Sequence, residues 1–278
     1  MEFIKSLRLF ASYIKNIVKS WYFPVAIILY AAVLFISTYG DYKVSETAGA
    51  EYFIHYAFMN GSTSYFLPVI CALASATVFC REWISGYFVF TCSRIGKFGY
   101  IAAIQGSAAL SAFIVSALGT LIYFGIICIK FPIISTDPNL INGIIQGYTY
   151  GGLIGEGKIM LYYALTIILQ GAFSALLSSA AVVVSMFIVN PYLTIVSPMV
   201  LYIVVSNAMS VLSLPRMLNP YYVFSNFKYV NIAFGDTGEN TFNLIAGLYP
   251  FTYAIAFIIL ASIFMYLIIS KKYERREV

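Results

Sequence analysis

The run CREWISGYFVFTCSRIGK, Cys80–Lys97, holds the residues of this chain whose types and spacing are best suited to chemistry. It places Arg81, Glu82, Arg94 and Lys97 between two long apolar stretches. Charged residues make up only 10% of the chain, so this insert is a local concentration of charge. A charged, amphipathic insert between two membrane helices indicates a surface that a cytoplasmic partner protein recognises.

A second stretch, 152–159 (GLIGEGKI), approaches the GxxxxGK[ST] pattern of a phosphate-binding loop. Ile159 stands where Ser or Thr would bind magnesium, and no strand is expected before the glycines. The stretch also falls on the expected outer side of the membrane, away from ATP. We therefore expect a flexible loop or close helix packing here, and no nucleotide site.

Other reactive side chains are few and scattered. The single histidine, His55, belongs to no Cys, His or acid cluster, and the cysteines form no CxxC pair: Cys71, Cys80, Cys92 and Cys128. The expected spans carry almost no ionisable residue. Ion and proton pathways through a membrane usually require ionisable residues. This pattern argues against a proton-coupled carrier, a charged-filter channel and a membrane hydrolase. We expect no catalytic residue, metal site or cofactor on this chain.

The elements that position these residues are membrane helices. Apolar residues make up 61% of the chain, and its 10% of charged residues compare with about 25% in soluble domains. A bilayer core takes about 20 apolar residues per helix. Asn190-Pro191 divides one overlong run, because the residue before a proline avoids helical geometry. We expect an all-α integral membrane protein with six spans, at 21–39, 61–80, 98–128, 159–189, 191–212 and 248–270.

An outer loop is expected at 39–60. Two further segments, 1–20 and 214–247, are expected to lie at the membrane surface. At 1–20, apolar residues recur at the three-and-four spacing of one helical face, and basic residues occupy the other face. This pattern predicts an amphipathic interfacial helix, acting as a simple anchor or as a lever beside a partner. The segment 214–247 is too apolar for an ordinary loop and is broken at Asn219-Pro220. It predicts short helices that dip into the outer leaflet.

Small and polar residues within the spans predict helix packing. Small residues recur at four-residue steps in the third and fourth spans, which allows close helix approach: Ala103, Ser107 and Ser111, Ala108, Ala112 and Ser116, and Gly171, Ala175 and Ser179. In the fifth span, polar residues gather near one face: Tyr202, Ser206, Asn207 and Ser210. They could line a cavity or form hydrogen bonds between helices.

The distribution of Lys and Arg predicts the orientation of the chain. With six spans, eleven of the sixteen basic residues lie on the side of the termini and the insert, and five lie on the other side. Both termini are therefore expected in the cytoplasm. The net charge of +5 is a topology signal, and no nucleic-acid partner is expected. We expect one domain over residues 1–278, multi-pass in the plasma (cytoplasmic) membrane.

The order of these parts resembles the membrane subunit of ABC-2-type (type V) ABC transporters. That family has a basic interfacial helix, six spans, a charged insert after the second span and a broken apolar segment before the sixth. Its insert carries Glu followed by Gly, then Arg and Lys, which match Glu82, Gly86, Arg94 and Lys97. The resemblance covers nearly the whole chain, and the arrangement is more specific than the four residues.

The resemblance implies a role for each part. The insert at 81–97 would be a coupling helix seated in a cleft of a separate ATPase, with Trp83 and Tyr87 beside the four matching residues. Spans 1, 2 and 5 would form the conduit and the interface between two subunits. Re-entrant helices within 214–247 would close the outer exit, with these gate residues: Pro220, Tyr221, Tyr222, Phe224 and Phe227.

The function that the resemblance implies is that of a permease subunit in an ATP-driven exporter. ATP and magnesium would bind to the partner ATPase, and a second permease copy, identical or paralogous, would complete the complex in bacterial membrane lipid. Sparse buried charge and many aromatic residues favour an amphipathic or apolar cargo. The first expectation for the cargo is an antimicrobial or amphipathic peptide, and the second is a drug or lipid-like molecule. The alternatives are a non-transport assembly or sensor subunit and, third, a lipid-modifying membrane enzyme.

Overall fold

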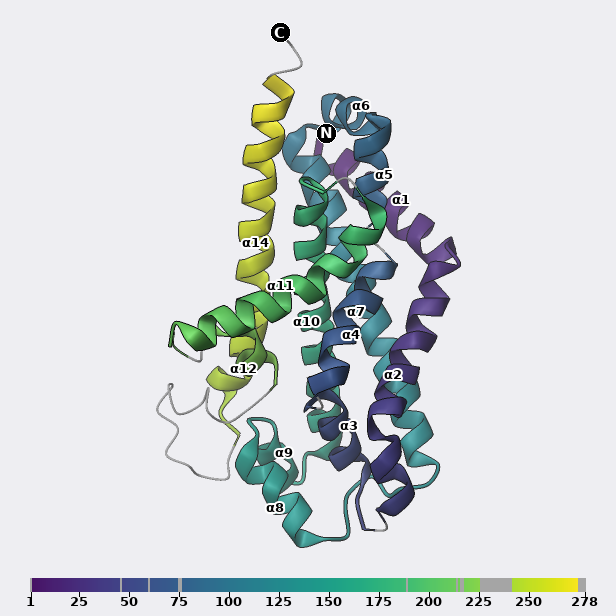
Figure 1. The fold of residues 1–278 in the computed structure, drawn as a ribbon, viewed down its shortest axis with the longest axis vertical. Coiled ribbons are helices and arrows are strands. Elements are labelled where there is room, and N and C mark those ends of the chain that lie inside the picture. The colour runs from purple at the N-terminus through teal and green to yellow at the C-terminus, as the bar shows by residue number, and fades with distance from the viewer. Residues whose placement is uncertain are drawn as a thin grey trace.

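The computed structural model describes residues 2–45, 47–59, 61–74, 77–188, 190–213, 215, 218–225 and 242–274. The regular structure of these residues is helical (Figure 1). In chain order the helices are α1 (Glu2–Lys19), α2 (Tyr22–Val44), α3 (Ala50–Met59), α4 (Gly61–Leu73), α5 (Thr77–Ser85), α6 (Tyr87–Ile95), α7 (Lys97–Cys128), α8 (Pro138–Gly147), α9 (Gly151–Gly155), α10 (Ile159–Ser185), α11 (Pro191–Val211), α12 (Pro220–Phe224) and α14 (Leu244–Glu274).

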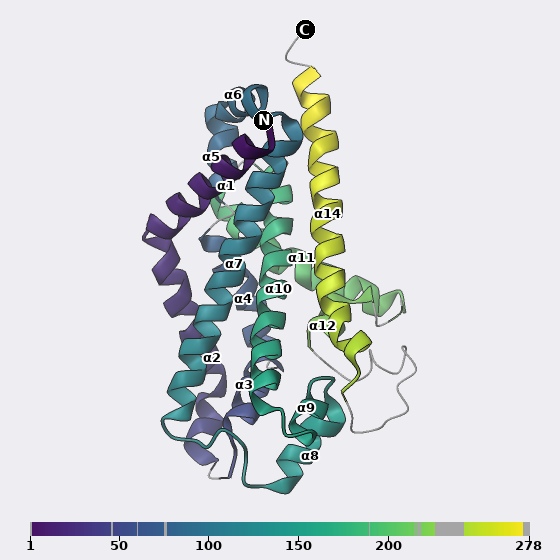
Figure 2. The ribbon, with the colours of Figure 1, turned by 180° about the vertical axis from the view of Figure 1, so that it is seen from behind.

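Among the described residues, five helices are long and apolar enough to cross a membrane: α2, α7, α10, α11 and α14. The chain is therefore an all-α protein of membrane-spanning character. α10 is the most buried of the five, and it contacts α4, α7, α11 and α14. Both ribbon views place α2 on one flank of α7 and α10 and α14 on the other, while α11 crosses the bundle obliquely (Figures 1 and 2).

The second expected span, 61–80, is not a single long helix. The structure divides it between α4, which has 13 residues and contains Pro68, and α5, which begins at Thr77. Proline has no backbone N–H to donate within a helix, and 13 residues are fewer than the roughly 20 that span a bilayer core. Six membrane-spanning helices are therefore not confirmed, and the described residues contain five candidates.

The outer loop expected at 39–60 is largely helical. α2 continues to Val44, and α3 buries Phe53, Ile54 and Ala57 completely. The segments before α3 and after α7 are joined by the backbone hydrogen bonds Ala50 N to Pro132 O, 2.9 Å, and Thr136 N to Thr47 O, 3.0 Å. A buried carboxylate strengthens this junction, because Glu51 accepts from Ser135 N at 2.6 Å. These contacts close the end of the bundle opposite the N-terminus.

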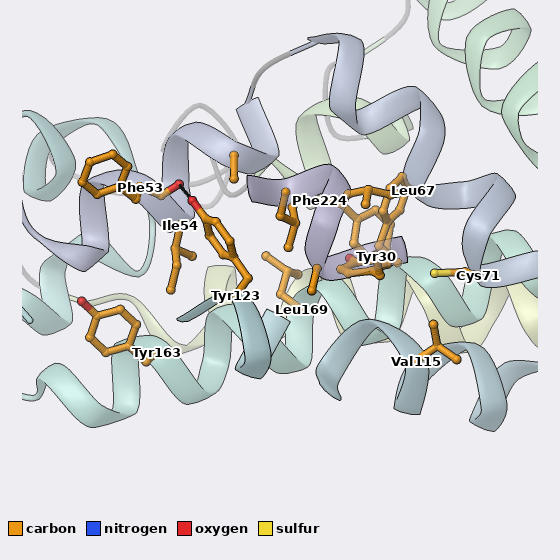
Figure 3. Close-up of a cluster of buried hydrophobic side chains, with 14 of the residues drawn as sticks. Tyr30, Phe53, Ile54, Leu67, Cys71, Val115, Tyr123, Tyr163, Leu169 and Phe224 are labelled. Carbon is orange, nitrogen blue, oxygen red and sulfur yellow. Dashed lines mark hydrogen bonds between the residues drawn. The ribbon is translucent and has the colours of Figure 1, made fainter. Parts of the chain in front are cut away.

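Close packing of α2, α7 and α10 forms the main core. The small residues expected at the helix contacts are buried in α7 and α10. Tyr123 of α7 donates to the backbone oxygen of Phe53 at 3.1 Å (Figure 3). Its hydroxyl also lies 2.9 Å from Thr38 Oγ1 of α2. A side chain at Gly119 would meet Tyr30 of α2, with the nearest ring atom 2.6 Å from a Cβ. Glycine therefore sets the distance between α2 and α7 at this point.

We expect Gly119→Ala to destabilise the bundle. Its added methyl group would overlap the Tyr30 ring, and overpacking of a tight core costs about 1–3 kcal/mol. The matched control is Gly125→Ala in the same helix, where a Cβ meets no atom within 4 Å. Thermal unfolding in detergent should show a lower midpoint for the first variant only. Equal midpoints would contradict the close approach of α2 and α7.

His55 should make the end of the bundle opposite the N-terminus sensitive to acid. Its ring lies against Tyr148, with centroids 3.4 Å apart, and its enclosed Nε2 atom has no hydrogen-bond partner among the described residues. Burial lowers the pKa of His55 from 6.5 to about 3. Because the unfolded chain takes up this proton first, stability should fall as pH decreases from about 6.5 towards 3.

The variant His55→Phe keeps the ring and removes the titrating group. Its midpoint of thermal unfolding should vary less with pH than that of the wild type between pH 6.5 and 4. Identical pH profiles for the two proteins would show that His55 is not the group responsible.

Candidate functional site

The candidate site is a bent pair of short helices at the end of the bundle that carries the N-terminus (Figure 1). We call residues 77–96, comprising α5, Gly86, α6 and Gly96, the elbow. Gly86 joins the two helices with φ +70°, and Gly96 joins α6 to α7 with φ +86°. These left-handed backbone conformations suit glycine, which has no Cβ to clash. The insert expected as one helix at 81–97 is therefore two helices with a fixed bend.

The inner face of the elbow is an aromatic core. The Trp83 ring of α5 stacks on the Phe88 ring of α6 across the glycine bend, with centroids 4.2 Å apart and planes at 21°. Both side chains belong to one buried cluster with residues of α1, α7, α10 and α14. The two halves of the elbow are thereby packed together and against four other helices, so they can move as one body.

A buried network of hydrogen bonds ties the elbow to two further helices. Glu82 of α5 accepts from Tyr13 of α1, whose hydroxyl lies 2.8 and 2.9 Å from its two carboxylate oxygens. It also accepts from Tyr100 of α7 at 2.8 Å. Both tyrosines are buried, while Glu82 is half-buried. One carboxylate therefore joins the interfacial helix, the elbow and the start of the third expected span.

The surroundings of Glu82 disfavour its charged form. Burial raises the pKa of Glu82, and the hydrogen bonds from Tyr13 and Tyr100 partly oppose this effect. Burial and the neighbouring carboxylate raise the pKa of Tyr13. Tyr13 therefore keeps its proton and acts as a donor at neutral pH. The network positions helices, and its geometry supplies no nucleophile or proton-transfer chain.

α1 uses one face to hold α7. Ser6 Oγ donates to the backbone oxygen of Gly99 at 2.9 Å. A Cβ at Gly106 would lie 3.3 Å from the Phe10 ring. With Tyr13 these contacts follow the spacing of one helical face. α1 therefore packs along the first turns of α7, and its place at the membrane surface stays a prediction.

The apolar face expected for α1 divides into two stripes in the structure. Phe10 and Ile17 pack against protein, whereas other apolar side chains remain exposed: Ile4, Leu7, Val18 and, just after the helix, Trp21. The exposed stripe suits contact with lipid, and the basic residues lie beside it. Helix α1 thus combines a protein face, an apolar face and a basic face.

The exposed surface of the elbow is apolar and basic. Three large side chains close together in sequence are exposed: Ile84 by 59%, Tyr87 by 56% and Phe90 by 67%. We call these three the elbow patch. Arg81 and Arg94 are also exposed in the same pair of helices. Exposed apolar groups surrounded by charge are typical of surfaces that bind another protein.

The residues that the sequence singled out take different places in the elbow. Glu82, Trp83 and Gly86 form its inner framework. Tyr87 and Arg94 are exposed, and Lys97 is the first residue of α7. Tyr13 and Tyr100, the two partners of Glu82, were not among the residues predicted for the site.

The polar residues of α11 hold the short helix α12. Asn219 caps α12 by accepting from Tyr221 N at 3.0 Å, and its Nδ2 donates to Ser206 O at 3.2 Å and to Ser210 Oγ at 3.4 Å. Asn207 is exposed. Of the four residues suggested as a cavity lining, Tyr202 alone lines the cavities found beside α12, of about 20 and 100 Å³.

Part of the expected outer gate is a fixed segment between helices. Within 218–225, Pro220 and Phe224 are buried, and Tyr221 and Tyr222 are half-buried. The Phe224 ring packs on Phe173 of α10, with centroids 4.9 Å apart. Tyr253 of α14 donates to Leu218 O at 3.0 Å. Contacts to α10, α11 and α14 therefore hold α12, while Phe227 lies outside the described residues.

Comparisons with known proteins give no relative. The chain matches no protein-family model, no curated protein and no solved structure.

Proposed function

We propose that this chain is the permease subunit of an ATP-driven exporter and that the elbow is its contact with a separate ATPase. The observation that carries the proposal is the elbow itself. Its outer side exposes the elbow patch, and its inner side is bonded through Glu82 to α1 and α7. A rigid body with an exposed contact surface and firm attachments to the bundle is suited to transmit motion.

The attachments define a path for that motion. A partner that displaces the elbow would pull on Tyr13 of α1 and on Tyr100 of α7 through the same carboxylate. Helix α5 also contacts α10 and α11, and α11 holds α12 through Asn219. Movement at the cytoplasmic end would therefore reach α12 through α11. In this mechanism α12 and the segment after it form the outer gate.

ATP would be bound by the partner, because the glycine-rich stretch near α9 has a structural role. Lys158 pairs with Glu156 at 2.8 Å, and Glu156 also accepts from Phe242 N at 3.2 Å. A Cβ at Gly151 would overlap the backbone oxygen of Ile144 in α8. The glycine thus permits close contact between α8 and α9. The lysine is placed to bind the adjacent carboxylate.

The remaining parts of the proposal concern orientation, assembly and cargo. The distribution of basic residues supports a cytoplasmic position for both termini. The membrane in this proposal is the plasma membrane of a bacterial cell. A second permease copy completes the conduit, and the apolar, aromatic lining beside α12 suits an amphipathic peptide, a drug or a lipid-like molecule. The alternative, a non-transport assembly or sensor subunit, would use the same elbow to bind a partner without an ATPase.

Co-purification tests the proposal. The tagged chain should be co-expressed with its neighbouring genes. The membranes are then solubilised in mild detergent, and the tagged chain is purified. We expect an ATPase in the complex and ATP hydrolysis that orthovanadate inhibits. A complex that contains another protein and hydrolyses no ATP would support the assembly or sensor subunit instead.

A further inference from the structure

An apolar groove runs between the first turns of α7 and the second half of α14. Its volume is about 310 Å³, within the lower range of small-molecule sites. Phe98, Ile101 and Ala102 line one wall, and residues of α14 from Ile258 to Tyr266 line the other. Figure 2 shows α14 along the flank of the bundle that α7 and α10 form. The groove is separate from the elbow patch and from the cavities beside α12.

The groove opens on a surface that a bilayer would cover. α7 and α14 are both candidate membrane spans, and Phe98, Ile259 and Ile263 are each more than half exposed. Ser262 Oγ donates to Ile258 O of its own helix at 2.8 Å, so the lining offers little hydrogen bonding to a ligand. An unbranched hydrocarbon chain is the occupant that matches such a lining.

Basic residues lie at one end of the groove. Lys97 immediately precedes Phe98, and Lys271 follows Tyr266 by little more than one turn of α14. The last turn of α6 adds the exposed Arg94. Long basic side chains at a helix end reach the headgroup layer, and basic pockets between membrane helices bind anionic headgroups.

We propose that the groove is a binding site for an anionic phospholipid. One acyl chain lies between α7 and α14, and the phosphate lies near Lys97 and Lys271. The narrow groove between two helices favours a lipid chain over a second copy of this chain, whose association would need a broad complementary face. Helix α11, which is as exposed as α14 and does not line the groove, offers such a face.

The position of the groove gives the lipid a structural role. Ile101 lines the groove and also belongs to the buried cluster that contains Trp83 and Phe88. Met265 and Ile269 of α14 pack in the same cluster. A bound acyl chain would therefore stabilise the packing of α14 against α7 next to the buried cluster of the elbow. This inference does not depend on the ATPase proposal.

Native mass spectrometry of the purified chain tests the site. The protein is delipidated in detergent and titrated with phosphatidylglycerol or with phosphatidylcholine that carries the same acyl chains. We expect a saturable adduct of phosphatidylglycerol, bound about tenfold more strongly than phosphatidylcholine because two lysines face the phosphate. Equal binding of the two lipids, or no saturable adduct, would overturn the proposal.

Variants of the groove locate the adduct. Ala102→Trp and, separately, Ile259→Trp fill the groove and should remove most of the bound phosphatidylglycerol. Leu260→Trp, at the neighbouring exposed position of α14, should bind it like the wild type. The double variant Lys97→Ala/Lys271→Ala should retain an adduct but lose the preference for phosphatidylglycerol. Unchanged adducts in both groove-filling variants would contradict the assignment. A lipid-independent dimer that these variants abolish would show that the occupant is a second copy.

Discussion

Replacing Ile84, Tyr87 and Phe90 together by alanine should abolish binding of the ATPase while the chain remains folded and inserted. All three side chains are more than half exposed, so their removal takes little from the core. An apolar side chain that anchors an interface contributes about 2 kcal/mol or more, so three should weaken binding by at least about a hundredfold. Affinity is measured between the purified chain in nanodiscs and the purified ATPase.

The control is an equally apolar side chain at another exposed site. Ile129, just beyond the far end of α7, is 84% exposed, and Ile129→Ala should leave the affinity unchanged. Unfolding midpoints should agree between the triple variant, the control and the wild type. ATPase binding by the triple variant at wild-type affinity would remove the elbow patch from the interface.

Replacing Glu82 by alanine should uncouple ATP hydrolysis from movement of the bundle. The variant removes the acceptor that Tyr13 and Tyr100 share. Each buried hydroxyl left without a partner costs about 1–3 kcal/mol, so the elbow should separate from α1 and α7 before the bundle unfolds. In proteoliposomes, cargo-stimulated ATP hydrolysis should fall to the basal rate, while membrane insertion is unchanged. Wild-type stimulation would contradict the role of Glu82.

Two further variants separate the charge of Glu82 from its hydrogen bonds. Because burial raises its pKa, the folded state favours the protonated acid, and its contribution to stability decreases as pH rises through the folded pKa. Glu82→Gln should therefore fold well at neutral pH and keep an acceptor for a tyrosine. Tyr13→Phe/Tyr100→Phe should show the same loss of coupling as Glu82→Ala. Coupling lost in Glu82→Gln alone would instead indicate that the charge contacts the ATPase.

The sequence predicted the long helices well because their signal is local. Runs of apolar residues predicted four spans whose bounds lie close to those of α7, α10, α11 and α14. Asn190 caps α11, and Pro191 is its first residue. The span expected at 61–80 stays unconfirmed, because apolar composition could not reveal that α4 ends at Leu73 and α5 begins at Thr77. Hydrophobicity also gave no reason to expect a buried α3. The depth of α3 depends on contacts with α7 and α8, which are distant in sequence.

The site was predictable in position but not in its bonding. The charge of Arg81 and Glu82 between apolar runs was enough to locate the elbow. The partners of Glu82 are 69 and 18 residues away, and tyrosines are too frequent in this chain to mark a pair. Of these two partners, only Tyr13 has a position that points to the contact. It lies on the same face of α1 as Ser6 and Phe10, which pack against α7.

The most direct measurement of the central claim is photo-crosslinking from the elbow in native membranes. A photoreactive phenylalanine analogue is placed at position 90, and in a control protein at position 129. We expect illumination to link position 90, and not position 129, to a protein that peptide sequencing identifies as an ATP-binding cassette ATPase. Hydrolysis-blocking nucleotide should change the yield as the elbow moves. Crosslinks from position 90 to lipid alone, or to a protein without a nucleotide-binding domain, would contradict the account.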